Sequence, residues 1–266
     1  MNVSSLVSVV WIFKPILIQC PFNDHRKYEN YKVPEENCNV KFYQTVKQKG
    51  FTPKVVAEVG VWHPNTSNVY SYIEDGIKTI LVEPDPKSIE LIKNKWNKKS
   101  NVKLYEVALC DFEGEIKLCQ RESSTFVSSL PDSPALANDN CNIEESEEFT
   151  AQAMKFSTID DGTIDLISID TEGSEWFVIK NMISRPTIIS IETHGGVYVN
   201  PYLNELKTWM NENNYVLWFK DKSDSTYVLK NKIDVTLFDK INLSLSTTLI
   251  FIKSIKKRIS KKIKNR

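Results

Sequence analysis

The sequence predicts a doubly wound α/β fold, and three observations support this prediction. From residue 54 onward, short β-branched runs alternate with segments of helical period, which is typical of βαβ units and a mostly parallel sheet. Runs such as Val55–Ala57 and Ile164–Ile169 are apolar at successive positions, as expected of strands that helices cover on both faces. A chain of 266 residues with 41% hydrophobic residues is also long enough to bury one large core.

The β-branched and aromatic runs predict seven strands: Lys54–Val59, Thr79–Glu83, Val102–Ala108, Ile164–Asp170, Thr187–Glu192, Tyr215–Phe219 and Thr247–Phe251. The helical repeats between them predict four helices, of which Gly76 ends the first: Ser67–Asp75, Pro86–Asn97, Ser174–Met182 and Asn200–Asn213.

Around these elements the chain divides into three parts. Residues 1–50 form an N-terminal extension whose helical pattern, stopped by Gly50, predicts a helix that caps a sheet edge. Residues 51–252 form the main domain, and residues 253–266 form a basic amphipathic tail. Within the domain, the acidic, Ser-rich stretch Gln120–Lys155 lacks a clear period and predicts a long irregular insertion, such as a lid or a substrate loop.

Cysteines and charges limit the class of protein. Five Cys are few and scattered and form no CxxC pair, which argues against a disulfide framework or a structural zinc site and favours a reduced, cytoplasmic setting. Acidic and basic residues number 34 each, yet residues 1–252 carry 34 acidic and 26 basic residues, a net charge of −8. This imbalance predicts that the body of the protein does not bind nucleic acid.

Both ends of the chain were considered as membrane contacts. The apolar segment Met1–Cys20 lacks a basic region before it and is interrupted by Lys14-Pro15, so we interpret it as a segment packed on the domain rather than a signal peptide or anchor. In the tail, Ile255, Ile259 and Ile263 recur every four residues among Lys and Arg. Such a helix could lie on an anionic membrane, and the alternative is a solvated, frayed terminus.

The residues that follow the strands are the candidates for chemistry, because ligands of open parallel sheets bind beyond the carboxyl ends of the strands. Gly60 follows the first strand and would let the backbone approach a ligand, although Trp62 and Asn65 replace the other glycines of a dinucleotide fingerprint. Glu83 ends the second strand, where a carboxylate can accept hydrogen bonds from both ribose hydroxyls of an adenosine cofactor. Taken singly, Gly60 could be an ordinary turn and Glu83 a helix-capping acid.

Five segments taken together resemble the FkbM family of S-adenosylmethionine-dependent methyltransferases. They are Val56–Gly60, Val82–Pro86, Leu104–Gly114, Ser157–Asp161 and above all Ile164–Glu175, which reads IDLISIDTEGSE. Their order and spacing match from about residue 53 to about residue 220. The first loop departs from the family pattern, because Trp62 and Pro64 stand where the family has Ala-Asn-x-Gly after its glycine.

The resemblance implies a Rossmann-like class I methyltransferase fold with a seven-stranded sheet whose last strand is antiparallel. It also implies S-adenosyl-L-methionine as cofactor and methyl transfer to oxygen, often on a sugar or a glycan-bearing natural product. Carried over by position, Glu58 and Gly60 lie near the methionine part, Glu83 binds the ribose, and Ala108 with Asp111 lies near the adenine.

Transfer to a hydroxyl also requires a base that accepts its proton. The candidates are Asp170 and Glu172 after the fourth strand, and Glu192 and His194 at the end of the fifth; the ordinary pKa of His194 is near neutrality, which suits a general base. Alternatively, Asp170, Glu192 and His194 could bind Mg²⁺ or Mn²⁺, and the sequence does not decide this. Tyr198 and Tyr202 could stack on a sugar ring.

Two other functions remain open at this stage. One is an NAD-dependent oxidoreductase on the same fold, which the missing glycines weaken. The other is an inactive methyltransferase-like binding module, held to a membrane or a partner by residues 253–266. The acceptor and the oligomeric state are not determined by the sequence.

Overall fold

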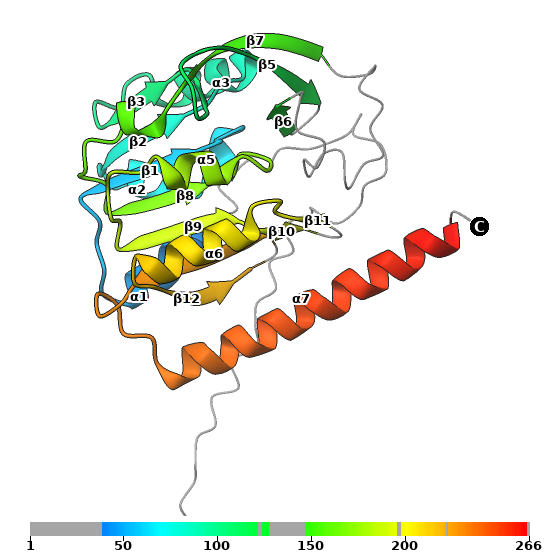
Figure 1. Ribbon diagram of the computed structural model, residues 1–266. Helices are drawn as coiled ribbons and strands as arrows, with labels where there is room; N and C mark the ends of the chain where they lie inside the picture. The colour runs from blue at the N-terminus through cyan, green and yellow to red at the C-terminus, as the bar shows by residue number, and fades with distance from the viewer. Residues whose placement is uncertain (1–38, 122–123, 128–146, 196–197, 222, 265–266) are drawn as a thin grey trace, which may run out of the picture. The chain divides into compact units, whose positions relative to one another are not determined.

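Seven strands form the main sheet of the computed structural model, which describes residues 39–121, 124–127, 147–195, 198–221 and 223–264. The strand order is β12-β13-β9-β8-β1-β2-β3 (Figure 1). The order reverses between β1 and β8, which makes their carboxyl ends the expected ligand site. The bounds are β1 Val55–Val59, β2 Lys78–Val82, β3 Val102–Tyr105, β8 Leu166–Ile169, β9 Ile188–Glu192, β12 Tyr215–Lys220 and β13 Asp224–Leu229.

The expected antiparallel last strand is confirmed, but it is β13 and not 247–251. All pairings in this sheet are parallel except those of β13, which runs antiparallel to both β9 and β12. The sequence analysis missed β13 because Asp, Ser and Thr open it. These polar side chains are nevertheless buried, so the usual apolar signal of a central strand is absent.

Helices cover both faces of the sheet (Figure 1). Side chains of the strands divide between two cores, one on each face. One core contains Ala57 from β1 together with residues of α5 and α6, and the other contains Val56 together with residues of α1, α2 and α3. This confirms the doubly wound prediction. The helix bounds are α1 Val40–Gln48, α2 Tyr70–Glu74, α3 Pro86–Trp96, α5 Glu175–Lys180 and α6 Leu203–Glu212, with short 3-10 turns at Pro64–Thr66 and Phe156–Thr158.

A second sheet corrects two predictions. The expected strand 102–108 is divided: β3 belongs to the main sheet, and β4 (Ala108–Leu109) pairs with β7 (Glu147–Met154) in a four-stranded sheet. The order of that sheet is β4-β7-β5-β6, with β5 at Gly114–Arg121 and β6 at Ser124–Val127. The stretch 120–155 is therefore not irregular where the structure describes it. In β7 the residues that face the core of this sheet are Phe149, Ala151 and Ala153. Because alanine is only weakly hydrophobic, the alternation of apolar and polar residues that predicts a strand is faint here.

The last helix, α7 (Leu237–Lys264), replaces the strand predicted at 247–251. Leu and Ile recur there at steps of three and four residues, a helical period that the β-branched composition concealed. The helix contacts β12, and the Lys49 ammonium pairs with the Asp239 carboxylate at 2.6 Å near its start. Among the helices that the structure describes, none combines the length and the apolar composition that crossing a bilayer requires.

The predicted N-terminal helix is present as α1. Its Phe42 ring lies 6.4 Å from the ring of Phe219 on β12, and Phe42 and Val46 belong to the core on one face of the sheet. Two short strands, β10 (His194–Gly195) and β11 (Tyr198–Val199), form a hairpin after β9. Met1–Cys20 lies outside the described residues, and α7 runs across the predicted boundary at residue 252, so the three-part division stays a prediction.

Candidate active site

Gly60 brings the first loop into direct contact with the end of β8. Its φ is +80°, and a Cβ at this position would lie 1.7 Å from the carbonyl oxygen of Asp170. No side chain fits at that separation, so this glycine is required by close approach of two backbones and not only by its turn. The sequence-predicted glycine and acid are therefore neighbours in space.

Glu83 holds the same loop through its carboxylate. The N–H groups of Val61 and Trp62 donate to its Oε2 at 2.9 and 2.8 Å, and the Asp85 N–H donates to its Oε1 at 3.0 Å. Burial raises the pKa of Glu83, and these three N–H donors oppose the rise. The residue that the sequence assigns to a ribose thus also shapes the loop beside it.

Glu58 lies within β1 and ties that strand to the start of α2. Its Oε2 accepts a hydrogen bond from the Ser67 hydroxyl at 2.5 Å, and its Oε1 accepts one from the Asn68 N–H at 2.7 Å. Burial raises the pKa of Glu58 from 4.5 to about 7, more than these hydrogen bonds lower it. The side chain is 3% exposed, so Glu58 acts as part of the fold.

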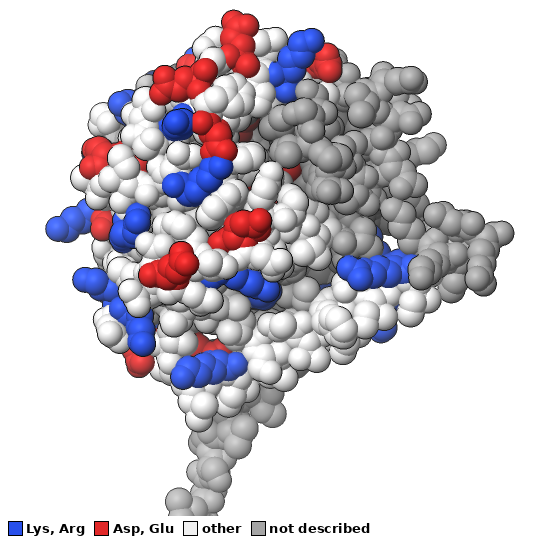
Figure 2. Space-filling model, in the orientation of Figure 1, with Lys and Arg blue, Asp and Glu red and all other residues white. Residues whose placement is uncertain are grey.

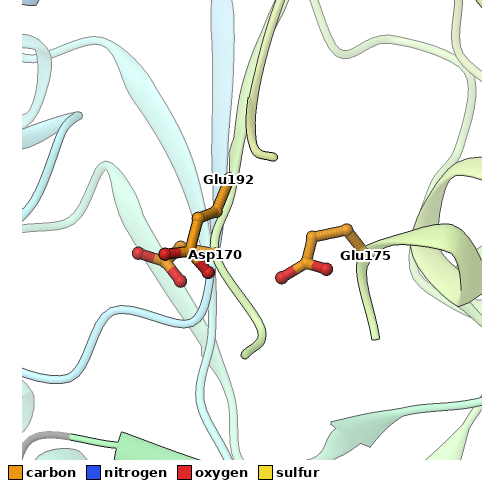
Figure 3. A group of neighbouring side chains, drawn as sticks. All are labelled: Asp170, Glu175 and Glu192. Carbon is orange, nitrogen blue, oxygen red and sulfur yellow. The ribbon is translucent and has the colours of Figure 1, made fainter. Parts of the chain in front are cut away.

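Three carboxylates, which we call the acidic triad, meet at the carboxyl ends of β8 and β9: Asp170, Glu175 and Glu192. One oxygen from each lies within 4.8 Å of the others, and Figure 3 shows Glu175 pointing toward the other two. The parallel register pairs Ile169 with Ile191, which places Asp170 beside Glu192. Glu175 reaches the same point from the first turn of α5.

Glu175 is fully buried and its position is fixed by hydrogen bonds. The N–H groups of Thr171 and Gly173 donate to its Oε1 at 2.9 and 3.1 Å, and the Asn200 amide donates to its Oε2 at 2.5 Å. Glu175 also lies in the first turn of α5, where an acid is favoured by the helix dipole. Asn200 was missed because it follows a loop of no regular period.

The acidic triad is strongly perturbed electrostatically. Burial raises the pKa of Glu192 well above 4.5, and repulsion from Asp170, Glu172 and Glu175 adds to the rise. For Asp170, loss of hydration and then repulsion by Glu172 and Glu175 raise the pKa well above 3.8. Because solvent still reaches the Asp170 side chain, repulsion is the firmer cause. Burial and mutual repulsion thus both favour the protonated forms of these carboxyls.

Polar atoms without partners surround the triad. Among the described residues, four buried side-chain atoms lack a hydrogen-bond partner, and three of them are Glu192 Oε2, Thr171 Oγ1 and the Tyr198 hydroxyl. Thr171 follows Asp170 in the chain, and the triad carboxylates raise the pKa of Tyr198 beyond the effect of its burial. Since buried polar groups are nearly always satisfied, these atoms mark a place for a ligand.

Backbone strain marks the same two loops. Four described residues other than glycine have positive φ, and two of them are Asn, which tolerates that conformation. The others are Trp62 at 52° in the first loop and Glu172 at 53° in the loop after β8. Strained non-glycine residues gather at functional sites, which agrees with the position of these loops.

His194 lies at the end of β9 but outside the acidic triad. Its Nε2 lies 3.2 Å from the carbonyl oxygen of Asp221 and must therefore donate, so Nδ1 accepts from the Thr193 hydroxyl at 2.8 Å. Burial and the nearby Lys220 lower the pKa of His194. The imidazole is thus neutral with both nitrogens engaged.

The two residues predicted near the adenine lie on the side of the second sheet. Ala108 is buried in β4 beside Cys110 and Ala153. Asp111 is exposed and bonded to the Lys180 ammonium and to the Asn181 amide at the end of α5. A hollow of about 550 Å³ opens near Glu83, and none of the triad residues lines it: its walls are Pro84, Pro86, Ile89, Glu90, Lys93, Asn94, Glu106, Thr150, Ala151 and Gln152.

Asp224 is a further acid that the sequence analysis missed, because β13 was not predicted. The antiparallel register pairs it with Glu192, and it is 8% exposed. Burial and repulsion from Asp221 and Asp170 raise its pKa well above 3.8. It extends the negative potential behind the triad.

Comparison with known proteins agrees with this architecture. The family model described as "Methyltransferase FkbM domain" matches residues 54–217. No curated protein matches the chain. The chain also aligns with solved structures, among them a precorrin-6y C5,15-methyltransferase from Geobacter metallireducens, with 13% identity, coverage of 70% of this chain and 84% of that one, and a TM-score of 0.35.

Two further structures are a glycopeptide N-methyltransferase, MtfA, and TrmK from M. capricolum in complex with S-adenosyl-homocysteine. MtfA shows 6% identity, coverage of 73% and 90%, and a TM-score of 0.40. TrmK shows 13% identity, coverage of 73% and 69%, and a TM-score of 0.36. The family match spans more than half of the sequence and includes β1, β2, β8 and β9, whose ends build the site. The chain therefore belongs to the FkbM family of methyltransferases.

Proposed function

We propose that this methyltransferase moves the methyl group of S-adenosylmethionine to a hydroxyl group of a sugar or a glycan. The observation that carries the proposal is the acidic triad at the switch point of the sheet. A carboxylate whose pKa is raised above its usual range is a stronger general base, and transfer to a hydroxyl needs a base. The resemblance to FkbM enzymes supports a carbohydrate acceptor.

Asp170 is the proposed base. The acceptor oxygen forms a bond to the methyl carbon while the carbon–sulfur bond breaks, and the hydroxyl proton passes to the Asp170 carboxylate. Of the triad, Asp170 is the most exposed member, so an acceptor can reach it. Repulsion from Glu172 and Glu175 raises its proton affinity. Glu172 and His194 stay alternative bases. His194 is disfavoured because both of its ring nitrogens are already in hydrogen bonds.

Cofactor binding is proposed for the loop of Gly60 and for Glu83. Glu83 Oε1 accepts one N–H and keeps a second lone pair that a ribose hydroxyl can use. Glu58 is committed to Ser67 and Asn68, so its effect on the cofactor passes through the loop. Contact of Ala108 and Asp111 with the adenine of the cofactor remains a proposal.

The acidic triad also fits a hard divalent cation, because such ions prefer carboxylate oxygens. Asp170, Glu175 and Glu192 are the residues that would hold Mg²⁺ or Mn²⁺, with Glu175 in the place that the sequence analysis gave to His194. A bound cation would lower the pKa of an acceptor hydroxyl. Titrating Mn²⁺ into the protein and following its paramagnetic signal tests this without an activity assay, and equal binding by E192Q would contradict it.

The acceptor assay tests the function directly. Wild-type protein is incubated with radiolabelled S-adenosylmethionine and a panel of free sugars, glycans and matched amino sugars. We expect label on a hydroxyl of at least one carbohydrate, a strong loss in D170N, and no loss in the matched surface variant E212Q. Label on amines and on no hydroxyl would contradict O-methylation.

Binding experiments can separate the two alternative functions, an NAD-dependent oxidoreductase and an inactive binding module. Family membership argues against the oxidoreductase, and the altered first loop keeps the inactive binding module as the main competitor. The exclusion of nucleic acid as an acceptor stays a prediction based on charge. A cytoplasmic location likewise stays a prediction.

A further inference from the structure

Helix α7 has one face turned toward the body of the protein. The residues of that face are partly covered and recur at steps of three or four, so they form one line along the helix. The helix contacts β12. It is mostly polar or small: Asp239, Leu243, Ser246, Ile250, Ser254 and Lys257.

The opposite face is apolar and exposed, and we call it the apolar stripe. Its residues also recur at steps of three or four, about half a helical turn away from the covered line. The stripe consists of Phe238, Ile241, Leu245, Leu249, Ile252, Ile255 and Ile259, with exposed fractions of 39–71%. Together with Leu237 and Phe251, it accounts for nine of the fifteen exposed large hydrophobic residues in the described chain, so the exposure is concentrated here.

Basic residues accompany the stripe toward the C-terminus. No acid follows Asp239, whereas nine Lys or Arg occur between residue 240 and the end of the chain. Lys253, Lys256 and Arg258 are exposed. Figure 2 shows the helix as a mostly white surface that carries blue side chains toward its C-terminal end. An apolar stripe with cations beside it is the pattern of a helix that lies in a membrane interface.

We propose that α7 docks this protein on an anionic lipid bilayer, with the apolar stripe in the headgroup and acyl boundary and the basic residues on lipid phosphates. The charges and the apolar stripe of α7 together favour an anionic bilayer over other partners. A second copy paired through its own α7 would bring the same cations without acids to meet them, and a nucleic acid would leave the apolar stripe uncovered. The basic residues and the limited apolarity of α7 favour a helix in the membrane plane over one that crosses the bilayer. The inference is independent of the proposed methyl transfer.

Co-sedimentation of the full chain with vesicles tests the proposal. Vesicles of phosphatidylcholine alone are compared with vesicles that also contain phosphatidylserine, at low and high salt. Wild type should bind the anionic vesicles and dissociate as salt rises, because surface charge attraction is screened. Equal binding to both kinds of vesicle at all salt concentrations would overturn the role of the basic residues.

Variants separate the helix from the rest of the chain. We expect L245S/L249S/I252S and K253E/K256E/R258E each to lower the bound fraction at least about fivefold. The control L91S/I183S replaces two exposed apolar residues outside α7 and should bind like wild type. All side chains changed are exposed, and unchanged thermal unfolding verifies that each variant is folded.

Two results would overturn the proposal. Undiminished vesicle binding by both α7 variants would show that another segment binds the lipid. Absence of vesicle binding by wild type, combined with a dimer that L245S/L249S/I252S dissociates in analytical ultracentrifugation, would assign the stripe to a second copy.

Discussion

The two halves of the strand-end edge differ in how their acids are satisfied. On the side of β1 and β2, every carboxylate oxygen of Glu58 and Glu83 accepts at least one hydrogen bond from a neighbouring N–H or hydroxyl group. On the side of β8 and β9, Glu192 Oε2 has no partner and Asp170 is open to solvent. The acids of the first half are engaged in the fold, with one lone pair of Glu83 Oε1 left for a ribose, whereas Asp170 and Glu192 of the second half keep oxygens available to a ligand.

This difference predicts which measurement each substitution moves. Changes in the first half should alter stability and cofactor affinity, since its acids hold loops in place. Changes in the second half should alter turnover with little loss of stability, because separating or neutralising crowded carboxylates relieves repulsion. The predictions below run from the largest expected effect to the smallest.

Replacing Asp170 by Asn should give the largest effect. If Asp170 takes the hydroxyl proton, turnover falls about a thousandfold, while affinity for S-adenosylhomocysteine stays close to that of wild type. The melting temperature should hold or rise, because a repelling charge is removed. E212Q, at an exposed end of α6, is the control. Full activity of D170N would transfer the role of base to Glu172 or His194.

Replacing Gly60 by Ala should lower the free energy of unfolding by about 3 kcal/mol, because the new Cβ meets the Asp170 carbonyl oxygen. Gly76 supplies a matched control: it has the same φ of +80°, and a Cβ there meets nothing within 4 Å. G76A should therefore cost only about 1 kcal/mol for its φ. Equal losses in the two variants would show that the contact with Asp170 is unimportant.

Stability should fall as pH rises through the raised pKa of Glu58. Folding raises this pKa from 4.5 to about 7, so the folded state binds more protons than the unfolded state between those values. The contribution is fully present below pH 4.5 and is lost by about pH 7, and it amounts to at most about 3 kcal/mol. Chemical denaturation across this pH range should show that the free energy of unfolding depends less steeply on pH in E58Q than in wild type. An unchanged pH dependence in E58Q would assign the effect to the other buried carboxyls.

Replacing Glu83 by Gln should have the smallest of these effects. The uncharged carbonyl oxygen of Gln still accepts hydrogen bonds from the first loop, but more weakly. The NH₂ group of Gln, in the place of Oε1, would face the Asp85 N–H, which is also a donor. Affinity for S-adenosylhomocysteine should fall about tenfold, a loss near 1.4 kcal/mol. E74Q, on a surface ion pair with Lys99, is the control for charge alone. Unchanged affinity in E83Q would remove the ribose assignment.

The central sheet could be predicted from sequence because its strands are apolar on both faces. β1, β2, β8 and β9 were found within two residues of their observed bounds, and Gly60, Glu83, Asp170 and Glu192 follow or end them. The family resemblance came from the same segments. Strand ends are therefore where sequence reasoning was most informative.

The remaining elements and contacts depend on tertiary placement. β13 was missed since its buried residues are polar, and 247–251 was misread because β-branched residues also occur in helices. Glu175 could be located on its helix but not in the acidic triad, because that contact depends on how α5 packs on the sheet. The engagement of both His194 nitrogens depends on the loop around Asp221, which has no sequence signal.

Calorimetric titration of the purified protein with S-adenosylhomocysteine, with NAD⁺ in parallel, tests the central claim most directly. The claim is that the loop of Gly60 and Glu83 holds the adenosine cofactor next to the acidic triad. We predict saturable binding of S-adenosylhomocysteine, retained in D170N and lost in G60A, and no binding of NAD⁺. Binding of neither molecule, or of NAD⁺ alone, would contradict the account.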